Sequence, residues 1–111
     1  MANIAGQFVP QKIITDTDTN GILSAQSDQP GADQQVVMTG WEVSGGGALT
    51  AAGTLTITDG ITTLTTQMQA AAVAPIGRSR LFAFARGKRV TATLSNVGNI
   101  TTTFIVYYDI V

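Results

Sequence analysis

The residues best suited to chemistry form a short acidic run, Asp16-x-Asp18-x-Asn20-Gly21. Oxygen ligands at alternate positions followed by a glycine open the calcium loops of EF-hand proteins, where the glycine permits a sharp turn. The bidentate glutamate expected about eleven residues after Asp16 is Ser27 here, and the flanking residues have the composition of strands rather than helices. We interpret the run as a turn rich in Asp and Asn. The alternative is a truncated cation site that also uses Asp28.

A second group of residues is basic. Five of the six cationic residues lie within twelve positions: Arg78, Arg80, Arg86, Lys88 and Arg89. Such a group can be a footprint for nucleic acid or for an acidic protein surface. No aromatic residue is interleaved at a spacing that would stack bases, because Phe82 and Phe84 have the positions of core residues. We therefore predict that Arg86, Lys88 and Arg89 contact a protein partner and no nucleic acid, with a solvated hairpin tip as the alternative.

Catalytic groups are scarce. The chain has no histidine and no cysteine, so it lacks the commonest general base and every thiol nucleophile or thiolate ligand. The glycines at 45–47 would cradle a phosphate only with a following helix and a suitable lysine or fingerprint spacing, and neither follows. Paired carboxylates can hydrolyse glycosides, but a sandwich of 111 residues with small loops leaves little room for a cleft. We predict no enzyme, and no catalytic, cofactor or metal residues.

The composition predicts one domain with few surface ions. Of 111 residues, 44% are hydrophobic and 12% are charged, with a net charge of -1, so Thr, Gln, Ser, Asn and Gly must cover most of the surface. Such a surface gives little repulsion between molecules and indicates burial in an assembly, with a neutral monomer as the alternative. No secretory pattern and no membrane-spanning apolar run is visible. We expect folding in a cytoplasm and no membrane partner.

The element that organises the chain is a predicted hairpin, Gly53 to Gln69, folded about Asp59-Gly60. An Asp-Gly pair suits a two-residue type I′ turn, because both residues tolerate positive φ. In that register Leu55 lies opposite Leu64, with the leucines and isoleucine on one face and threonines on the other. The hairpin needs further strands to cover its apolar face.

Those strands are predicted on both sides of the hairpin. Residues 12–15 and 35–43 precede it, and alternation in the second places Trp41 in the core on one face with Val37, Thr39 and Val43. After the hairpin, residues 81–85 and 90–94 are expected to pair with each other. The β-prone residues 101–111 are apolar on both faces and are expected to form a central strand or one that a partner buries.

This pattern predicts an all-β protein of seven to eight strands. We expect an antiparallel β-sandwich, jelly-roll-like or of another Greek-key kind. Residues 12–111 form the sandwich domain, and residues 1–11 form an extended N-terminal arm. We predict that the arm contacts a neighbouring subunit through Ile4, Phe8 and Val9.

Four stretches carry a resemblance to a known class: residues 41–47, 53–60, 86–94 and the final strand. In these the sequence resembles small structural proteins of tailed-bacteriophage virions, in particular head decoration or cement proteins with a jelly-roll-like sandwich. The resemblance implies a non-enzymatic homo-oligomer, often a trimer, that is assembled in the host cytoplasm and located in the virion. Its implied partner is the major capsid protein or another virion protein. The alternative is a receptor- or carbohydrate-binding tip of a tail fibre or surface protein.

Overall fold

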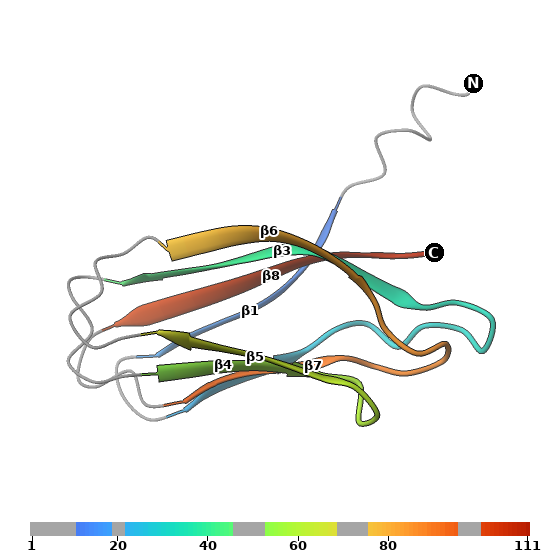
Figure 1. Ribbon diagram of the computed structural model, residues 1–111, viewed down its shortest axis with the longest axis horizontal. Helices are drawn as coiled ribbons and strands as arrows, with labels where there is room; N and C mark the ends of the chain where they lie inside the picture. The colour runs from blue at the N-terminus through green and yellow to red at the C-terminus, as the bar shows by residue number, and fades with distance from the viewer. Residues whose placement is uncertain (1–10, 19–21, 46–52, 69–75, 96–100) are drawn as a thin grey trace, which may run out of the picture.

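The computed structural model describes residues 11–18, 22–45, 53–68, 76–95 and 101–111. These residues form eight strands: β1 (Lys12–Asp18), β2 (Leu23–Gln26), β3 (Val36–Gly45), β4 (Gly53–Thr58), β5 (Thr63–Met68), β6 (Ile76–Ala83), β7 (Thr91–Ser95) and β8 (Thr102–Ile110). The strands build two antiparallel sheets that lie face to face (Figure 1), which confirms the predicted all-β sandwich. The described part has no helix long and apolar enough to cross a membrane.

The strand order is that of a jelly roll. Sheet A has the order β1-β8-β3-β6, and sheet B has the order β2-β7-β4-β5. Four antiparallel pairs join the chain from its ends inward, β1 with β8, β2 with β7, β3 with β6 and β4 with β5. Successive pairs belong to sheet A and sheet B in turn. The same alternation of pairs arises when one long antiparallel hairpin folds over into the two sheets of a jelly roll. Of the two alternatives for the final strand, a central strand or one that a partner buries, the structure shows the first, because β8 lies between β1 and β3.

The core between the sheets is apolar and follows strand alternation. In β8 the side chains of Phe104, Val106 and Tyr108 are buried while their neighbours are only half-buried. Trp41 is 4% exposed and belongs to the same cluster, as the sequence predicted. Because strand side chains point to opposite faces in turn, each strand gives one row to this core and one row to the outer surface.

A β-bulge in β3 changes which residues face the core. The pairing of β3 with both of its neighbours shifts between Met38 and Gly40. On the N-terminal side of the shift Val36 and Met38 are buried, and beyond it Trp41 and Val43 are buried. The predicted single alternation, with Val37 on the face of Trp41, is therefore wrong. An extra residue at a bulge reverses the alternation of the strand.

The predicted hairpin of residues 81–85 with 90–94 is also wrong. β6 pairs with β3 in sheet A, whereas β7 pairs with β2 and β4 in sheet B. Residues 84–90 thus cross from one sheet to the other at one end of the sandwich. Phe84 and Val90 are buried there, and Phe84 packs edge-on against Phe82 at a centroid distance of 4.9 Å. The core positions predicted for Phe82 and Phe84 are confirmed, but sequence alternation does not say which sheet a strand joins.

The turn between β4 and β5 is longer than predicted. Thr58 pairs with Thr63, so residues 59–62 form the turn. The two-residue loop with Leu55 opposite Leu64 is wrong, since Leu64 faces Ile57 instead. The faces were nevertheless right, because Leu55 and Ile57 are buried and Leu64 packs against the core.

Asp59 explains the longer turn and ties it to the neighbouring sheet. Its Oδ1 accepts the backbone N–H groups of Ile61 (2.8 Å) and Thr62 (2.6 Å). Its Oδ2 accepts the N–H of Ala85 (2.8 Å), just after β6. An Asp side chain that caps nearby N–H groups stabilises a wider turn than the type I′ form. Gly60 has a φ of 90°, in agreement with the prediction that this position needs positive φ.

Candidate interaction surfaces

The outer face of sheet B is covered by uncharged polar side chains. The outward residues of its four strands are threonine, serine or glutamine: Ser24, Gln26, Thr54, Thr56, Thr58, Thr63, Thr65, Gln67, Thr91, Thr93 and Ser95. Cross-strand pairs bond within this array, such as Thr63 to Thr58 at 3.0 Å and Ser24 to Thr93 at 3.3 Å. The face carries no ion in the described strands, so it can be covered without removing a charge from water.

The outer face of sheet A is more apolar. Ile13 is 49% exposed on β1 and Leu81 is 77% exposed on β6. Between them lie half-buried Ile105 and Tyr107 of β8. Two carboxylates, Glu42 and Asp109, point outward on this face. This face is therefore less polar than the outer face of sheet B, although it carries two charges.

An open depression of about 440 Å³ is hollowed in this face between β3 and β6. Gly40 and Gly77 line it and leave bare backbone where other residues would place side chains. The Tyr107 hydroxyl donates a hydrogen bond to Glu42 at its edge, and this bond raises the pKa of Tyr107. Since Glu42 is already engaged and has no second carboxylate beside it in the depression, the paired acids of a hydrolase are lacking there.

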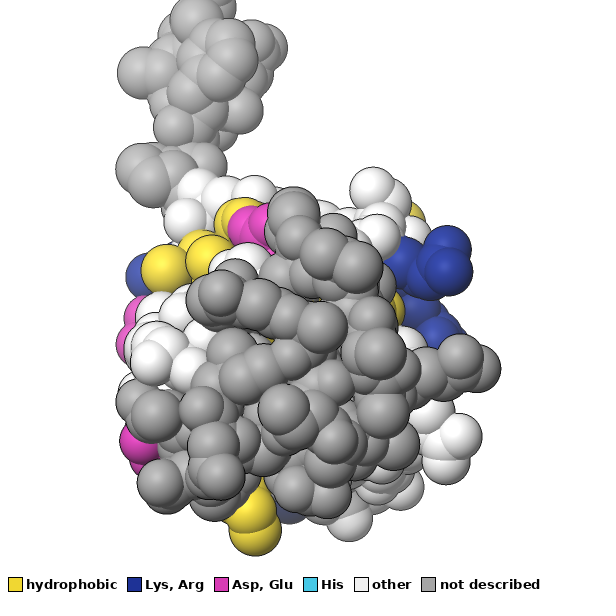
Figure 2. All heavy atoms as spheres, turned by 90° about the vertical axis from the view of Figure 1, so that its left-hand side faces the viewer, with side chains coloured by type: hydrophobic (Ala, Val, Ile, Leu, Met, Phe, Trp, Pro, Cys, Tyr) yellow, Lys and Arg dark blue, Asp and Glu magenta, His cyan; other side chains and the backbone are white. Residues whose placement is uncertain are grey.

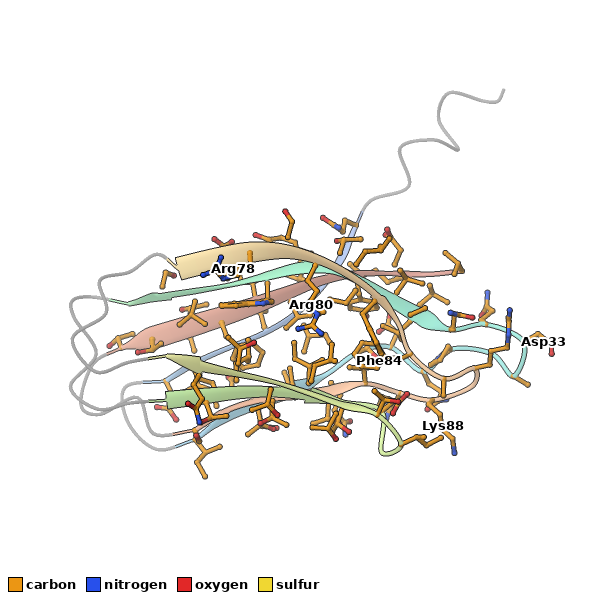
Figure 3. All side chains as sticks on the ribbon, in the orientation of Figure 1. Asp33, Arg78, Arg80, Phe84 and Lys88 are labelled. Atoms are coloured by element: carbon orange, nitrogen blue, oxygen red, sulfur yellow. The ribbon has the colours of Figure 1, made fainter. Side chains whose placement is uncertain are left out.

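The cations that are adjacent in sequence separate into two groups in space. Arg78 and Arg80 lie on β6, at the edge of sheet A. The predicted contact residues Arg86, Lys88 and Arg89 lie on the connection to β7, all exposed. Figure 3 draws Lys88 at the opposite end of the sandwich from Arg78.

Two of the three predicted contact cations are held by neighbouring groups. Arg86 donates to the backbone oxygen of Asp33 at 2.6 Å, and Arg89 reaches the side-chain oxygen of Gln26 at 3.5 Å. Figure 3 shows Asp33 and Lys88 at the same end of the sandwich. The described structure holds no ion pair between these cations and an acidic side chain, so their charges are open to an acidic partner.

The acidic run examined for cation binding is mostly part of a strand. Asp16 and Asp18 lie in β1, so the prediction that a turn begins at Asp16 is wrong there, and Asn20 lies outside the described residues. Asp16 accepts the N–H groups of Thr17 (2.9 Å) and Ser24 (3.0 Å), which ties β1 to β2. Across the described ranges no three acidic, His or Cys side chains gather as a metal site would require.

Asp28, the fourth residue proposed for a cation site, has a different partner. Its carboxylate pairs with the Lys12 ammonium at 3.0 Å, and this contact raises the pKa of Lys12. Both side chains are largely exposed. The pair therefore adds little stability.

The buried carboxylate of Asp59 has a structural role. Burial acts against its ionisation, but the N–H groups of Ala85, Thr62 and Ile61 outweigh burial and hold the pKa of Asp59 below its usual value. Both oxygens are occupied by these donors. A carboxylate used in this way is not available as a general base.

Sequence reasoning missed the placement of Arg78 and Arg80. Arg78 pairs with Trp41, so its side chain leaves β6 on the core-facing side, and Arg80 follows on the same side by alternation. Figure 3 shows Arg80 directed into the space between β6 and β5. The signal was present in the alternate row Arg78, Arg80, Phe82 and Phe84, which places two cations in line with two core residues. The predicted arm residues Ile4, Phe8 and Val9 lie outside the described residues.

No protein-family model matches this chain, and no curated protein matches it. A search of solved structures finds similarity to a chain in the structure titled "Cryo-EM structure of giant freshwater prawn Macrobrachium rosenbergii extra small virus (XSV) VLP". The two are 13% identical, with a TM-score of 0.37, over 90% of this chain and 77% of that one. The similarity found is thus to a viral particle protein, at a level that carries no conclusion about function.

Proposed function

We propose that this protein is a non-enzymatic structural protein of a virion, which decorates or cements a phage capsid as a homo-oligomer. The observation that supports the proposal is the low charge of both outer sheet faces. Sheet B presents only threonine, serine and glutamine outward, and sheet A presents two carboxylates among apolar and hydroxyl side chains. Broad faces with few charges suit burial against other subunits, where area and complementarity provide the binding energy.

The fold is compatible with this role but does not by itself indicate it. Jelly rolls occur in viral capsid proteins and also in lectins and cupins, and a shared fold does not imply a shared function. The choice between an assembly role and an enzymatic role must therefore rest on the side chains present. The one buried carboxylate, Asp59, is saturated by backbone donors, and the described depression lacks a pair of carboxylates. An assembly role needs neither a free buried carboxylate nor a pair of carboxylates.

The position of the aromatic residues counts against a sugar-binding tip. Carbohydrate sites need aromatic side chains exposed beside polar groups, because one ring face must be free to stack. In the described ranges Trp41, Phe84, Phe104 and Tyr108 are buried in the core. Tyr107 is half-buried and bonded to Glu42. A glycan array measures this alternative directly, and specific binding would favour it.

Attachment to the capsid is assigned to two features that the sandwich itself does not need. One is the arm, through Ile4, Phe8 and Val9, and the other is the tip formed by Arg86, Lys88 and Arg89. Arm contacts bury apolar area and should survive moderate salt. Tip contacts are exposed and should weaken as salt rises, because charges are screened over about 8 Å at physiological ionic strength.

The proposal is tested on virions purified from the source of the gene. Quantitative mass spectrometry should find the chain in a fixed ratio to the major capsid protein, and its absence would overturn the proposal. A chain that lacks residues 2–9 should fold but attach less at any salt. Lys88→Ser with Arg89→Ser should attach less at low salt only. Arg86 is kept because it donates to the backbone oxygen of Asp33 at 2.6 Å, whereas the contact of Arg89 with Gln26 is longer, at 3.5 Å.

A further inference from the structure

β6 is an edge strand of sheet A, and its free side is exposed. In the strand order β1-β8-β3-β6, β6 pairs with β3 on one side only. Residues 77–81 are all exposed in succession, although a strand of a sandwich ordinarily buries every second side chain. Leu81, at 77%, is the most exposed of the described large hydrophobic residues. This stretch of β6 is therefore accessible to a partner.

The backbone of β6 turns one row of hydrogen-bonding groups toward its free side. Phe84 donates its N–H to the backbone oxygen of Val36 in β3 (2.9 Å). The backbone oxygen of Arg78 also points to β3, since it lies 2.9 Å from the Cβ position of Gly40. Successive residues of a strand direct their N–H and C=O groups to opposite sides. The residues that face the free side are thus the odd-numbered ones between these two, Ser79, Leu81 and Ala83.

The next residue in this outward row is already bonded by a carboxylate. The Ala85 N–H donates to the Oδ2 of Asp59 at 2.8 Å. The outward N–H and C=O groups of Ser79, Leu81 and Ala83 make no hydrogen bond in the described structure. A row of unpaired groups on an edge strand is a template on which another extended segment can pair.

Two arginines lie beside this free row on the core-facing side of β6. Arg78 is opposite Trp41, and Arg80 follows on the same side. Within the described ranges neither guanidinium makes a hydrogen bond or an ion pair, and the ion pair that does form joins Lys12 to Asp28. In the end-on view of Figure 2, dark blue cationic side chains gather on the right-hand side, with no magenta acidic side chain beside them among the described residues in view. The two positive charges are therefore open to a partner.

A strand added to β6 would meet these side chains at fixed positions. Two of its residues, spaced two apart, would lie opposite Arg78 and Arg80 on the same face, within reach of cross-strand pairing. The residue between them would point to the other face, beside Leu81. The edge thus fits an extended segment that has acidic residues at two alternate positions and an apolar residue between them.

A second copy of β6 does not fit this description. Antiparallel pairing of two β6 strands over their exposed residues would place the arginines of both copies on one face. Like charges opposite each other in a strand pair are destabilising. Inward-pointing charges on an edge strand serve to prevent such pairing between identical strands. The same charges favour a strand of opposite sign.

We propose that the free edge of β6 binds an extended acidic segment of a partner protein by strand addition. The backbone of residues 79–83 provides the pairing, and Arg78 and Arg80 select the carboxylates. This deepens the proposed function, because it names the chemistry of one partner segment, and it rests on the assembly role proposed there.

The proposal is tested with a capped synthetic peptide in which glutamate alternates with isoleucine between flanking threonines. Fluorescence anisotropy measures its binding to the full chain. The parent should bind this peptide, and it should bind the same peptide with glutamine in place of glutamate more weakly. Arg78→Ser with Arg80→Ser should weaken binding of the glutamate peptide roughly 2- to 30-fold, because two attractive cross-strand pairs are lost. Equal binding of the two peptides by the parent, or undiminished binding by the variant, overturns the proposal.

The matched control is Lys88→Ser with Arg89→Ser, which removes the same charge from the connection to β7. Figure 3 shows Lys88 at the opposite end of the sandwich from Arg78. This control should leave peptide binding nearly unchanged, because salt screens exposed charges that lie far from the bound peptide. If the control loses binding and the β6 variant keeps it, the acidic peptide binds at the tip and the edge contact is refuted.

Strand addition also predicts a change in the backbone of β6. Amide hydrogen exchange, followed by nuclear magnetic resonance, should slow at Leu81 and Ala83 when the glutamate peptide is bound. It should change little at Phe84, whose N–H already bonds to β3. A peptide with N-methylated backbone should bind more weakly, because it has lost the donors for pairing. Unchanged exchange at Leu81 and Ala83 overturns strand addition even if the arginines attract the peptide.

The edge contact and the proposed function are judged by separate measurements. The peptide titrations use the purified chain and decide the edge contact, so their failure leaves the proposed function to virion mass spectrometry. Absence of the chain from virions overturns that function and leaves strand addition to be judged by the titrations.

Discussion

Replacing Asp59 by alanine removes the carboxylate that joins the β4–β5 turn to the end of β6. The substitution deletes three hydrogen bonds to a charged acceptor, each worth roughly 1.5–3 kcal/mol. Two of the donors, the N–H groups of Ile61 and Thr62, lie in the turn and can bond to water instead. Only the loss of the Ala85 hydrogen bond therefore contributes its full free energy. We expect a loss of about 2–4 kcal/mol in the free energy of unfolding at neutral pH, and roughly 10–20 °C in Tm.

This loss should depend on pH in a definite direction. The folded-state pKa of Asp59 is lowered, so its ionised form stabilises the fold above the unfolded pKa of about 3.9. That contribution disappears as the pH falls through the lower folded-state value. Urea denaturation of parent and variant at pH 7 and in acid should therefore show a difference in unfolding free energy that shrinks in acid.

The matched control is Asp33→Ala, which removes an exposed carboxylate at the same end of the sandwich (Figure 3). It should change stability by no more than about 0.5 kcal/mol. If Asp59→Ala is as mild as this control, or if its effect is the same at both pH values, the Asp59 carboxylate does not hold the turn as described.

Two further substitutions test glycine positions. Gly60→Val should destabilise the fold by roughly 1–3 kcal/mol, because φ is 90° there and a β-branched residue is strained in that region. Gly60→Asn should destabilise it less. If thermal denaturation shows the same stability with Val as with Gly, the turn geometry is contradicted. Gly40→Ala should destabilise by a similar amount, on the order of 1–3 kcal/mol. Its Cβ would lie 2.9 Å from the backbone oxygen of Arg78, and an unchanged Tm would mean that the bulge adjusts freely.

Much of the architecture could be predicted because alternation and turn chemistry are local signals. The sandwich, the central last strand, the buried Trp41 and the positive φ at Gly60 all follow from such signals. The errors arose where one residue changes a register. The bulge beside Gly40 reversed the alternation of β3, and the Asp59 side chain widened a turn that the dipeptide alone suggested would be tight.

The candidate contact surfaces were less predictable because they depend on which strands become neighbours. Arg78 and Arg86 are close in sequence, but one belongs to a sheet edge and the other to a crossing between sheets. Asp16 looked like a turn residue, yet it lies in β1 opposite Phe104. Edge positions follow from strand order, and strand order is a long-range property that no local pattern contains.

The central place of β8 has a consequence for how the chain is made. Both neighbours of β8 in sheet A precede it in sequence, so the sides of β1 and β3 that will face β8 stay unpaired until β8 has left the ribosome. Sheet B uses only earlier strands and can assemble first. A nascent chain stopped before Thr102 would expose two apolar edges, which are sites for aggregation. Sheet A therefore cannot close before β8 has been made, and long-range pairing of this kind makes folding slow.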